Sequence, residues 1–121
     1  MICTQPPRHD VPGRRILIAE DEACSRLLLI DILLQMGWRP HAARTGRHLL
    51  RLFAEGGAAV MLLDYHLPDM PAPALIRQLR REPIRRTIPP IIVLSAGISP
   101  DQGLQLQQLA VRQILDKPVD T

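Results

Sequence analysis

The sequence predicts a single α/β domain built around a parallel sheet of five strands. Its 121 residues suit one domain, and the 46% apolar content is enough to form a core. Short segments of strand length, most of them strongly apolar, recur along the chain and are separated by segments of helical length. Strands that alternate with helices in this way form βαβ units, which pair in parallel through right-handed crossovers.

The N-terminal part of the chain predicts a lead-in, a buried strand and a helix. Residues 1–13 hold three of the twelve prolines and no hydrophobic periodicity, so we expect a flexible segment there and an ordered domain over residues 14–121. The apolar run at 15–19 stops at three acidic residues, as a buried parallel strand does when it reaches a loop. Residues 23–36 predict a helix that ends before Gly37.

A second strand and a second helix follow. Residues 38–43 predict a strand, and Pro40 places it at a sheet edge because proline cannot donate to a central ladder. Thr45 is a good cap for a helix over 46–55, which the glycine pair at 56–57 ends.

The second half of the chain repeats the alternation three times. The predicted elements are a strand at 59–63, a helix near 74–82, a strand at 91–94, a helix from Ser99-Pro100 to about Ala110 and a strand at 112–116.

Composition excludes several classes of protein. Aromatic residues make up 2% of the chain, which leaves almost no material for stacking nucleobases, and the fourteen arginines are scattered, so we expect no nucleic-acid binding through this domain. Cys3 and Cys24 lack the spacing of a disulfide scaffold or a cysteine metal site. No apolar stretch approaches about 18 residues, and the N-terminus lacks a signal peptide. We therefore expect a cytoplasmic chain without membrane contact.

Five polar residues follow the predicted strands at the point where each strand ends. Glu20 and Asp21 follow the first, Asp64 the third, Ser95 the fourth and Lys117, the only lysine, the fifth. The carboxyl ends of parallel strands meet at one edge of a sheet, so we expect these side chains to converge. A single acidic, serine or lysine residue after a strand is more often a turn or helix-capping residue than part of a functional site. That explanation is weaker when all five residues lie at the same edge of the sheet.

The convergence predicts a divalent metal and phosphoryl chemistry. Clustered carboxylates repel by about 4 kcal/mol per pair at 4 Å in an effective dielectric near 20, so a cation belongs among them. Oxygen ligands, with the backbone carbonyl of His66 beside them, favour Mg²⁺ or Mn²⁺ over softer metals. Ser95 can donate to a phosphate oxygen, Lys117 can neutralise it, and Asp64 can form an aspartyl phosphate.

Four motifs together resemble the receiver domain of two-component response regulators. They are the segments 16–22 (ILIAEDE), 62–70 (LLDYHLPDM), 92–96 (IVLSA) and 116–118 (DKP), which occur in the family's order and at fitting separations. The resemblance covers the chain from about residue 14 to residue 118. It implies a flavodoxin-like, doubly wound sheet with strand order 2-1-3-4-5.

The resemblance also implies a function and a role for each residue at the strand ends. Asp64 is the expected phosphoacceptor, and its donor is a phosphohistidine on a sensor histidine kinase or a histidine phosphotransfer protein. Glu20, Asp21, Asp64 and the His66 carbonyl are the expected Mg²⁺ ligands. The Ser95 hydroxyl, the Ala96 amide and Lys117 are expected to contact the phosphoryl group. Such a domain catalyses only its own phosphorylation and dephosphorylation, so we expect no other enzymatic activity.

The sequence departs from the family pattern in four places. The acidic pair is Glu20-Asp21 rather than two aspartates. Ile114 stands where the family has an aromatic residue that reports phosphorylation, and Pro71-Ala72-Pro73 replaces a loop that normally contains glycine. The family's fifth helix is not expected, because the chain ends soon after the fifth strand. The broad apolar surface of residues 27–36 would then lack cover, which predicts either a fragment of a longer polypeptide or a homodimer through the first helix.

Two other functions remain as alternatives. A pseudo-receiver would keep the fold as a protein-interaction module without phosphoryl chemistry. A phosphatase-like hydrolase would use Asp64 as nucleophile, but it needs a second acid two residues later, where this chain has His66.

Overall fold

The computed structural model describes residues 14–81 and 88–117. Within these ranges lie β1 (Arg15–Ala19), α1 (Ala23–Gln35), β2 (Arg39–Ala43), α2 (Gly46–Ala54), β3 (Val60–Asp64), α3 (Ala72–Arg81), β4 (Ile91–Ser95), α4 (Pro100–Gln108) and β5 (Gln113–Asp116). Every predicted element is present, with ends that differ from the prediction by two residues at most. The predicted lead-in at 1–13 and the residues after Lys117 lie outside the described ranges.

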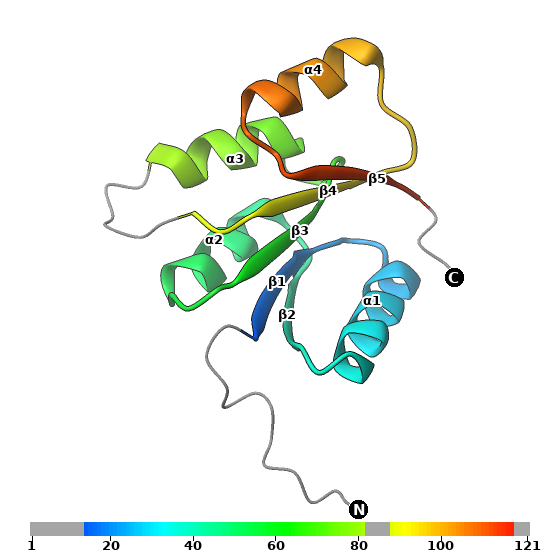
Figure 1. Ribbon diagram of the computed structural model, residues 1–121, viewed down its shortest axis with the longest axis vertical. Coiled ribbons are helices and arrows are strands. Elements are labelled where there is room, and N and C mark those ends of the chain that lie inside the picture. Colours follow the sequence, from blue (N-terminus) through cyan, green and yellow to red (C-terminus); the bar gives the residue numbers. More distant parts are fainter. Residues whose placement is uncertain (1–13, 82–87, 118–121) are drawn as a thin grey trace, which may run out of the picture.

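All five strands run parallel in one sheet with the order β2-β1-β3-β4-β5 (Figure 1). The predicted strand order is therefore confirmed. Pro40 lies in β2 at one edge of the sheet, where its missing N–H disrupts no ladder between central strands. Parallel pairing brings the carboxyl ends of β1, β3, β4 and β5 to the same side of the molecule.

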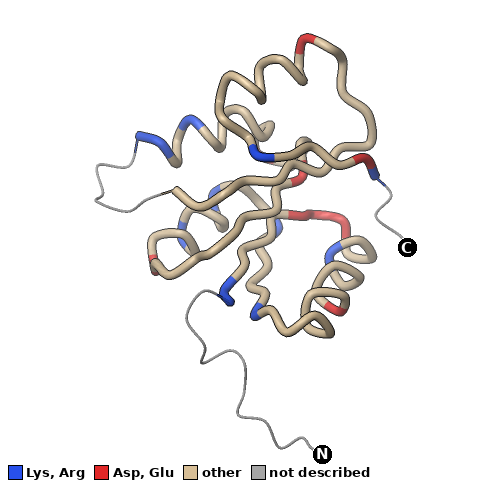
Figure 2. The backbone as a smooth tube through the Cα atoms, viewed as in Figure 1, with Lys and Arg blue, Asp and Glu red and all other residues tan. Residues whose placement is uncertain are grey.

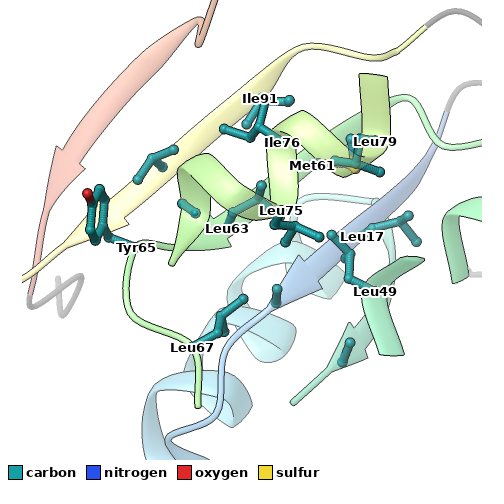
Figure 3. Packing of buried hydrophobic residues seen from close by; sticks show 14 of the residues in the cluster. Leu17, Leu49, Met61, Leu63, Tyr65, Leu67, Leu75, Ile76, Leu79 and Ile91 are labelled. Atoms are coloured by element: carbon teal, nitrogen blue, oxygen red, sulfur yellow. The ribbon is translucent and has the colours of Figure 1, made fainter. Parts of the chain in front are cut away.

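Three helices cover one face of the sheet. The side chains of α2, α3 and α4 pack there on the strand residues that point to that side, and Figure 3 shows Leu75 and Leu79 of α3 directed toward Leu17 and Met61 of the sheet. All four of these side chains are at most 1% exposed. Full burial stabilises such a side chain by roughly 1.5–3 kcal/mol, so this layer forms the larger part of the core.

The opposite face is covered by α1 alone (Figure 1). Leu29 and Leu33 of α1 pack on the outward residues of β1, β3 and β4. No fifth helix follows β5 in the part of the chain that the structure describes, and Leu27, Leu34 and Met36 are 62%, 56% and 62% exposed. The uncovered apolar surface predicted for α1 is thus present.

The helix ends follow the predicted capping chemistry. Thr45 accepts a hydrogen bond from the His48 amide at 3.0 Å and starts α2, and Ser99 forms a reciprocal capping box with Gln102 at the start of α4. At the end of α1, Gly37 has a φ of 90°, and the amides of Gly37 and Trp38 bond back to the last turn in a Schellman motif. None of the described helices is long and apolar enough to span a membrane.

Candidate phosphoacceptor and metal site

Three carboxylates meet at the carboxyl edge of the sheet. Glu20 and Asp21 follow β1, Asp64 ends β3, and one oxygen of each lies within 4.8 Å of the other two. Glu20 is fully buried and Asp64 is 5% exposed, whereas Asp21 is open to solvent. Buried carboxylates at this separation repel strongly unless a cation lies between them.

Lys117 supplies part of that positive charge. Its Nζ lies 2.8 Å from Oε1 of Glu20 and 3.4 Å from Oδ2 of Asp64. The chain separates Lys117 from Glu20 by 97 residues, so the parallel sheet alone brings them together. One ammonium cannot balance three carboxylates, and the pocket remains negative.

The pKa values of this pair reflect burial and mutual attraction. Burial raises the pKa of Glu20 above its usual value, and the hydrogen bonds from Lys117 and from the Glu22 amide offset only part of that rise. Burial by itself would lower the pKa of Lys117, but its hydrogen bond to Glu20 and the charge of Asp64 outweigh this and raise it. Lys117 therefore stays protonated beside the carboxylates.

The loop that carries the first two acids is held by backbone contacts. The Glu22 amide donates to Oε2 of Glu20 at 3.1 Å, and the Glu20 amide donates to the Ala43 carbonyl at 2.9 Å. Arg26, one turn into α1, donates to the carbonyls of Glu20 and Asp21 at 3.2 and 3.1 Å. These bonds fix the direction in which Glu20 and Asp21 leave the sheet.

Ser95 lies at the same edge, at the end of β4. It is fully buried, and its Oγ accepts a hydrogen bond from the Gly97 amide at 2.9 Å. The Lys117 amide donates to the Ser95 carbonyl at 2.6 Å, which ties the end of β5 to the end of β4. Ala96 follows in an exposed loop directly after β4. Its predicted contact with a phosphoryl group through the backbone amide remains a prediction.

His66 lies two residues after Asp64, and its side chain is exposed. Its amide points toward Oδ1 of Asp64 at 3.4 Å, and its ring contacts the buried Tyr65 ring edge-on with centroids 4.8 Å apart. Sequence reasoning placed the His66 carbonyl among the metal ligands, and this role remains a prediction.

Asp69 is a residue that sequence reasoning passed over. Its two carboxylate oxygens accept hydrogen bonds from the amides of Gly46 and Arg47, at 2.8 and 3.0 Å, and so bind the loop after Asp64 to the start of α2. Burial would raise the pKa of Asp69, but these two amide bonds, together with its own amide and the charge of Arg47, outweigh it, and the pKa lies below its usual value. A carboxylate at a helix N-terminus is favourable, yet the helix concerned begins 23 residues earlier, so no local pattern indicated it.

The departures from the family pattern also have structural outcomes. Ile114 is partly buried and packs against the larger core cluster, on the same side of the sheet as its neighbour Val93. Within the segment Pro71-Ala72-Pro73, Ala72 begins α3 and Pro73 lies in its first turn, and both are buried. The helix therefore starts two residues before the predicted position. Proline suits the first turn of a helix, where the missing N–H has no intrahelical acceptor.

The donor set fits a hard divalent cation. Carboxylate oxygens are the preferred protein ligands of Mg²⁺, and no other group of three acids, histidines or cysteines in the described residues could hold a metal. The buried carboxylates of Glu20 and Asp64 lie at the carboxyl edge of the sheet. The Lys117 ammonium and the buried Ser95 hydroxyl lie at the same edge. Such a set can accept a phosphoryl group and hold its oxygens.

Comparison with known proteins agrees with this geometry. The sequence model of the response regulator receiver domain family matches residues 16–121. The chain therefore belongs to the response regulator receiver domain family, the class of signalling module found in two-component systems.

The relatives include much longer proteins that match this chain over one segment. The aerobic respiration control sensor protein ArcB of Escherichia coli is 28% identical over 109 residues, which are 90% of this chain and 14% of ArcB. The sensory/regulatory protein RpfC of Xanthomonas campestris is 30% identical over 115 residues, which are 93% of this chain and 16% of RpfC. The chain thus spans about one sixth or less of the length of these relatives.

Solved structures share the fold. A CheY-like receiver domain from Methylobacillus flagellatus superposes with a TM-score of 0.78 at 27% identity, covering 88% of each chain. The receiver domain of a histidine kinase from Syntrophus aciditrophicus gives a TM-score of 0.74 at 28% identity, covering 88% of this chain and 80% of that one. The predicted flavodoxin-like fold is confirmed.

Proposed function

We propose that this chain is a phosphoacceptor that takes a phosphoryl group from a phosphohistidine onto Asp64. The observation that carries the proposal is the contact of the only lysine with the acid cluster, since Nζ of Lys117 lies 2.8 Å from Glu20 and 3.4 Å from Asp64. An ammonium so placed can neutralise a phosphoryl oxygen bound to Asp64.

The transfer exchanges one bond for another. An oxygen of Asp64 attacks phosphorus, and the bond between phosphorus and the donor imidazole breaks. The imidazole nitrogen keeps the electron pair and takes up a proton, while Asp64 becomes an acyl phosphate. Because little covalent chemistry falls to other residues, catalysis here is positioning and charge stabilisation.

Glu20, Asp21, Asp64 and the His66 carbonyl are the residues that would hold Mg²⁺, with Mn²⁺ as a substitute. The metal would offset the charge that phosphoryl oxygens bring beside the carboxylates. Lys117 would pair with a phosphoryl oxygen, and the Ala96 amide would donate a hydrogen bond to another. The Ser95 hydroxyl accepts from Gly97 while its own proton is free to bond a phosphoryl oxygen, which would couple the state of Asp64 to the loop after β4.

The donor that we propose is a sensor histidine kinase or a histidine phosphotransfer protein. The names of the relatives support this, because ArcB is a sensor protein and mak3 of Schizosaccharomyces pombe, 32% identical over 111 residues, is a histidine kinase. We expect the chain to catalyse only its own phosphorylation and dephosphorylation. We place it in the cytoplasm, consistent with the free thiol of Cys24.

The test is phosphorylation by a small donor. The chain is incubated with acetyl phosphate and Mg²⁺, and its intact mass is compared with those of Asp64→Asn and Asp101→Asn. Asp101 is an exposed acid in the first turn of α4, so Asp101→Asn removes one carboxylate away from the pocket. We expect the wild type and Asp101→Asn to gain the mass of one phosphoryl group, and Asp64→Asn to gain nothing.

Other outcomes select the alternatives. If neither acetyl phosphate nor a phosphohistidine protein modifies the wild type, the chain is a protein-interaction module that keeps the receiver fold. Steady release of phosphate from phosphate esters, lost in Asp64→Asn, would assign a hydrolase instead.

A further inference from the structure

A groove of about 370 Å³ lies on the surface between α2 and α3 and shares no lining residue with the cluster of Glu20, Asp21 and Asp64. Arg47 and Arg51 of α2 form one wall, Gln78 of α3 forms the other, and Leu50 contributes an apolar part. The two arginines lie one helical turn apart, so their guanidinium groups project from the same side of α2.

The charge of this groove is only partly offset from within the domain, since the Asp69 carboxylate attracts Arg47 without forming an ion pair with it. The acids at the two ends of α2 have other partners, since Asp69 accepts from the Gly46 and Arg47 amides at its start and Glu55, just after its end, pairs with Arg15 at 3.0 Å. Among the residues that the structure describes, neither Arg47 nor Arg51 forms an ion pair.

The positive charge continues onto α3. Arg77 and Arg81 are exposed and again one turn apart, and Figure 2 shows basic segments on both helices while acidic segments mark the carboxyl ends of the strands. Four exposed arginines therefore follow two neighbouring helices on one side of the domain. An anionic partner would be attracted there and repelled from the phosphoacceptor pocket.

The groove adjoins the loop that follows Asp64. Gln78 contacts Sδ of Met70 through Nε2 at 3.8 Å, and Asp69 of the same loop binds the amide of Arg47. A partner in the groove would thus touch residues that are tied to the loop carrying His66.

We propose that this groove binds an acidic segment of a protein, with carboxylates on Arg47 and Arg51 and apolar side chains on Leu50. Guanidinium groups bind carboxylates in a bidentate way, and the roughly 6 Å between residues one helical turn apart matches carboxylates at the same spacing on a partner helix. The residues that line the groove include no aromatic ring on which a nucleobase could stack, which favours a peptide over a nucleic acid.

The experiment measures binding of a fluorescein-labelled oligoglutamate peptide by fluorescence anisotropy. Binding of a labelled single-stranded oligonucleotide is measured in the same way for comparison. Arg51→Gln is compared with Arg112→Gln, which removes one exposed positive charge before β5, outside the groove. We expect Arg51→Gln to weaken peptide binding about fivefold, Arg47→Gln/Arg51→Gln to weaken it further, and Arg112→Gln to change it less than about twofold.

Each other result overturns the proposal. Equal losses in Arg51→Gln and Arg112→Gln indicate diffuse charge attraction rather than a site, as does binding too weak to measure in the wild type. Tighter binding of the oligonucleotide, lost in Arg51→Gln, assigns the groove to nucleic acid. The outcome is independent of phosphotransfer, because Arg51→Gln leaves the phosphoacceptor pocket intact and should still gain a phosphoryl group from acetyl phosphate.

Discussion

At the scale of single residues, Lys117 and Glu20 show how burial and charge compete. Glu20 is fully buried, and a carboxylate in that position is tolerable only with partners, which here are the Lys117 ammonium and the Glu22 amide. Replacing one member of a buried ion pair is more damaging than the pair is stabilising, because the remaining charge loses its opposite charge. Lys117 therefore stabilises the buried Glu20 carboxylate, in addition to its proposed role in binding a phosphoryl group.

We expect Lys117→Met to lower the free energy of unfolding by about 3 kcal/mol in buffer with EDTA, measured by urea denaturation. Addition of Mg²⁺ should recover part of the loss, because the cation neutralises the same carboxylates. Arg112→Met is the control, since Arg112 is exposed, and it should change stability little. Equal effects of the two variants would contradict the pairing described here.

His41 is a second residue whose environment predicts a measurable effect. It lies in β2, and its Nε2 is buried without a hydrogen-bond partner among the described residues. Burial lowers the pKa of His41 below its model-peptide value of 6.5, the charges of Arg15 and Arg39 lower it further, and Glu55 opposes them only weakly. The folded protein therefore prefers the neutral imidazole.

The sign of the pH dependence follows from this preference. As the pH falls through 6.5, the unfolded chain takes up a proton before the folded one, so stability decreases until the folded-state pKa is passed and then levels off. We expect the free energy of unfolding to fall as the pH drops through 6.5, and this fall to be smaller in His41→Phe. An unchanged slope in that variant would assign the dependence to other groups.

At the scale of elements, the ends of α1 and α4 differ in how well the residue at the left-handed position suits that backbone conformation. The last turns of α1 and α4 both close in Schellman motifs, but the left-handed position is Gly37 in the first and Ala110, with a φ of 62°, in the second. A left-handed conformation costs an L-residue with a Cβ roughly 1–2 kcal/mol relative to glycine.

Ala110→Gly should therefore stabilise the protein, by about 1 kcal/mol after the greater freedom of glycine in the unfolded chain is subtracted. Ala54→Gly is the matched control, because Ala54 is an exposed helical residue, and it should lower stability. Thermal unfolding followed by circular dichroism measures both. A loss of stability in both variants would show that the backbone at Ala110 is not strained.

At the scale of the whole molecule, the acidic residues gather at the carboxyl edge of the sheet while basic residues lie along α2 and α3 (Figure 2). A third feature is the exposed apolar surface of α1. The acidic edge unites residues from β1, β3 and the end of β5. Any ligand that binds there links these strands, so its binding energy adds to the stability of the fold.

We expect Mg²⁺ to raise the melting temperature. At a concentration about 100 times its Kd, the stabilisation is about 2.7 kcal/mol, or about 10 °C for a domain of this size. EDTA should reverse the shift, and Asp21→Asn should reduce it, whereas Asp101→Asn should retain it. A shift of equal size in all three proteins would indicate a general salt effect rather than a site at the carboxylates.

We also expect self-association through α1, whose Leu27 and Leu34 are more than half exposed. Apolar surface of this kind is stabilised when a second copy covers it. Sedimentation velocity over a range of concentrations should show a dimer that Leu27→Gln/Leu34→Gln abolishes. Leu104→Gln, at a leucine that is 55% exposed on α4, should leave the dimer intact. A wild type that stays monomeric at every concentration would refute this prediction.

Most helices and strands could be predicted because each is indicated by residues close together in the sequence. Apolar strands, capping residues and the glycines at helix ends are short-range signals, and parallel order then follows from the alternation of strands and helices. The start of α3 was predicted less accurately, because prolines such as those at 71 and 73 can either precede a helix or lie in its first turn. Asp69 was missed because its partner amides belong to a helix far away in sequence.

The amino-acid sequence by itself determined the α/β class, the succession of elements and the residues that stand at each strand end, since these depend on periodicity and on the chemistry of neighbours. Only the tertiary structure decided that Lys117 contacts Glu20 at 2.8 Å, that Asp69 binds the start of α2, and that Arg47 and Arg51 share a groove with Gln78. Such contacts join segments distant along the chain, and their distances arise from packing, which no local pattern encodes.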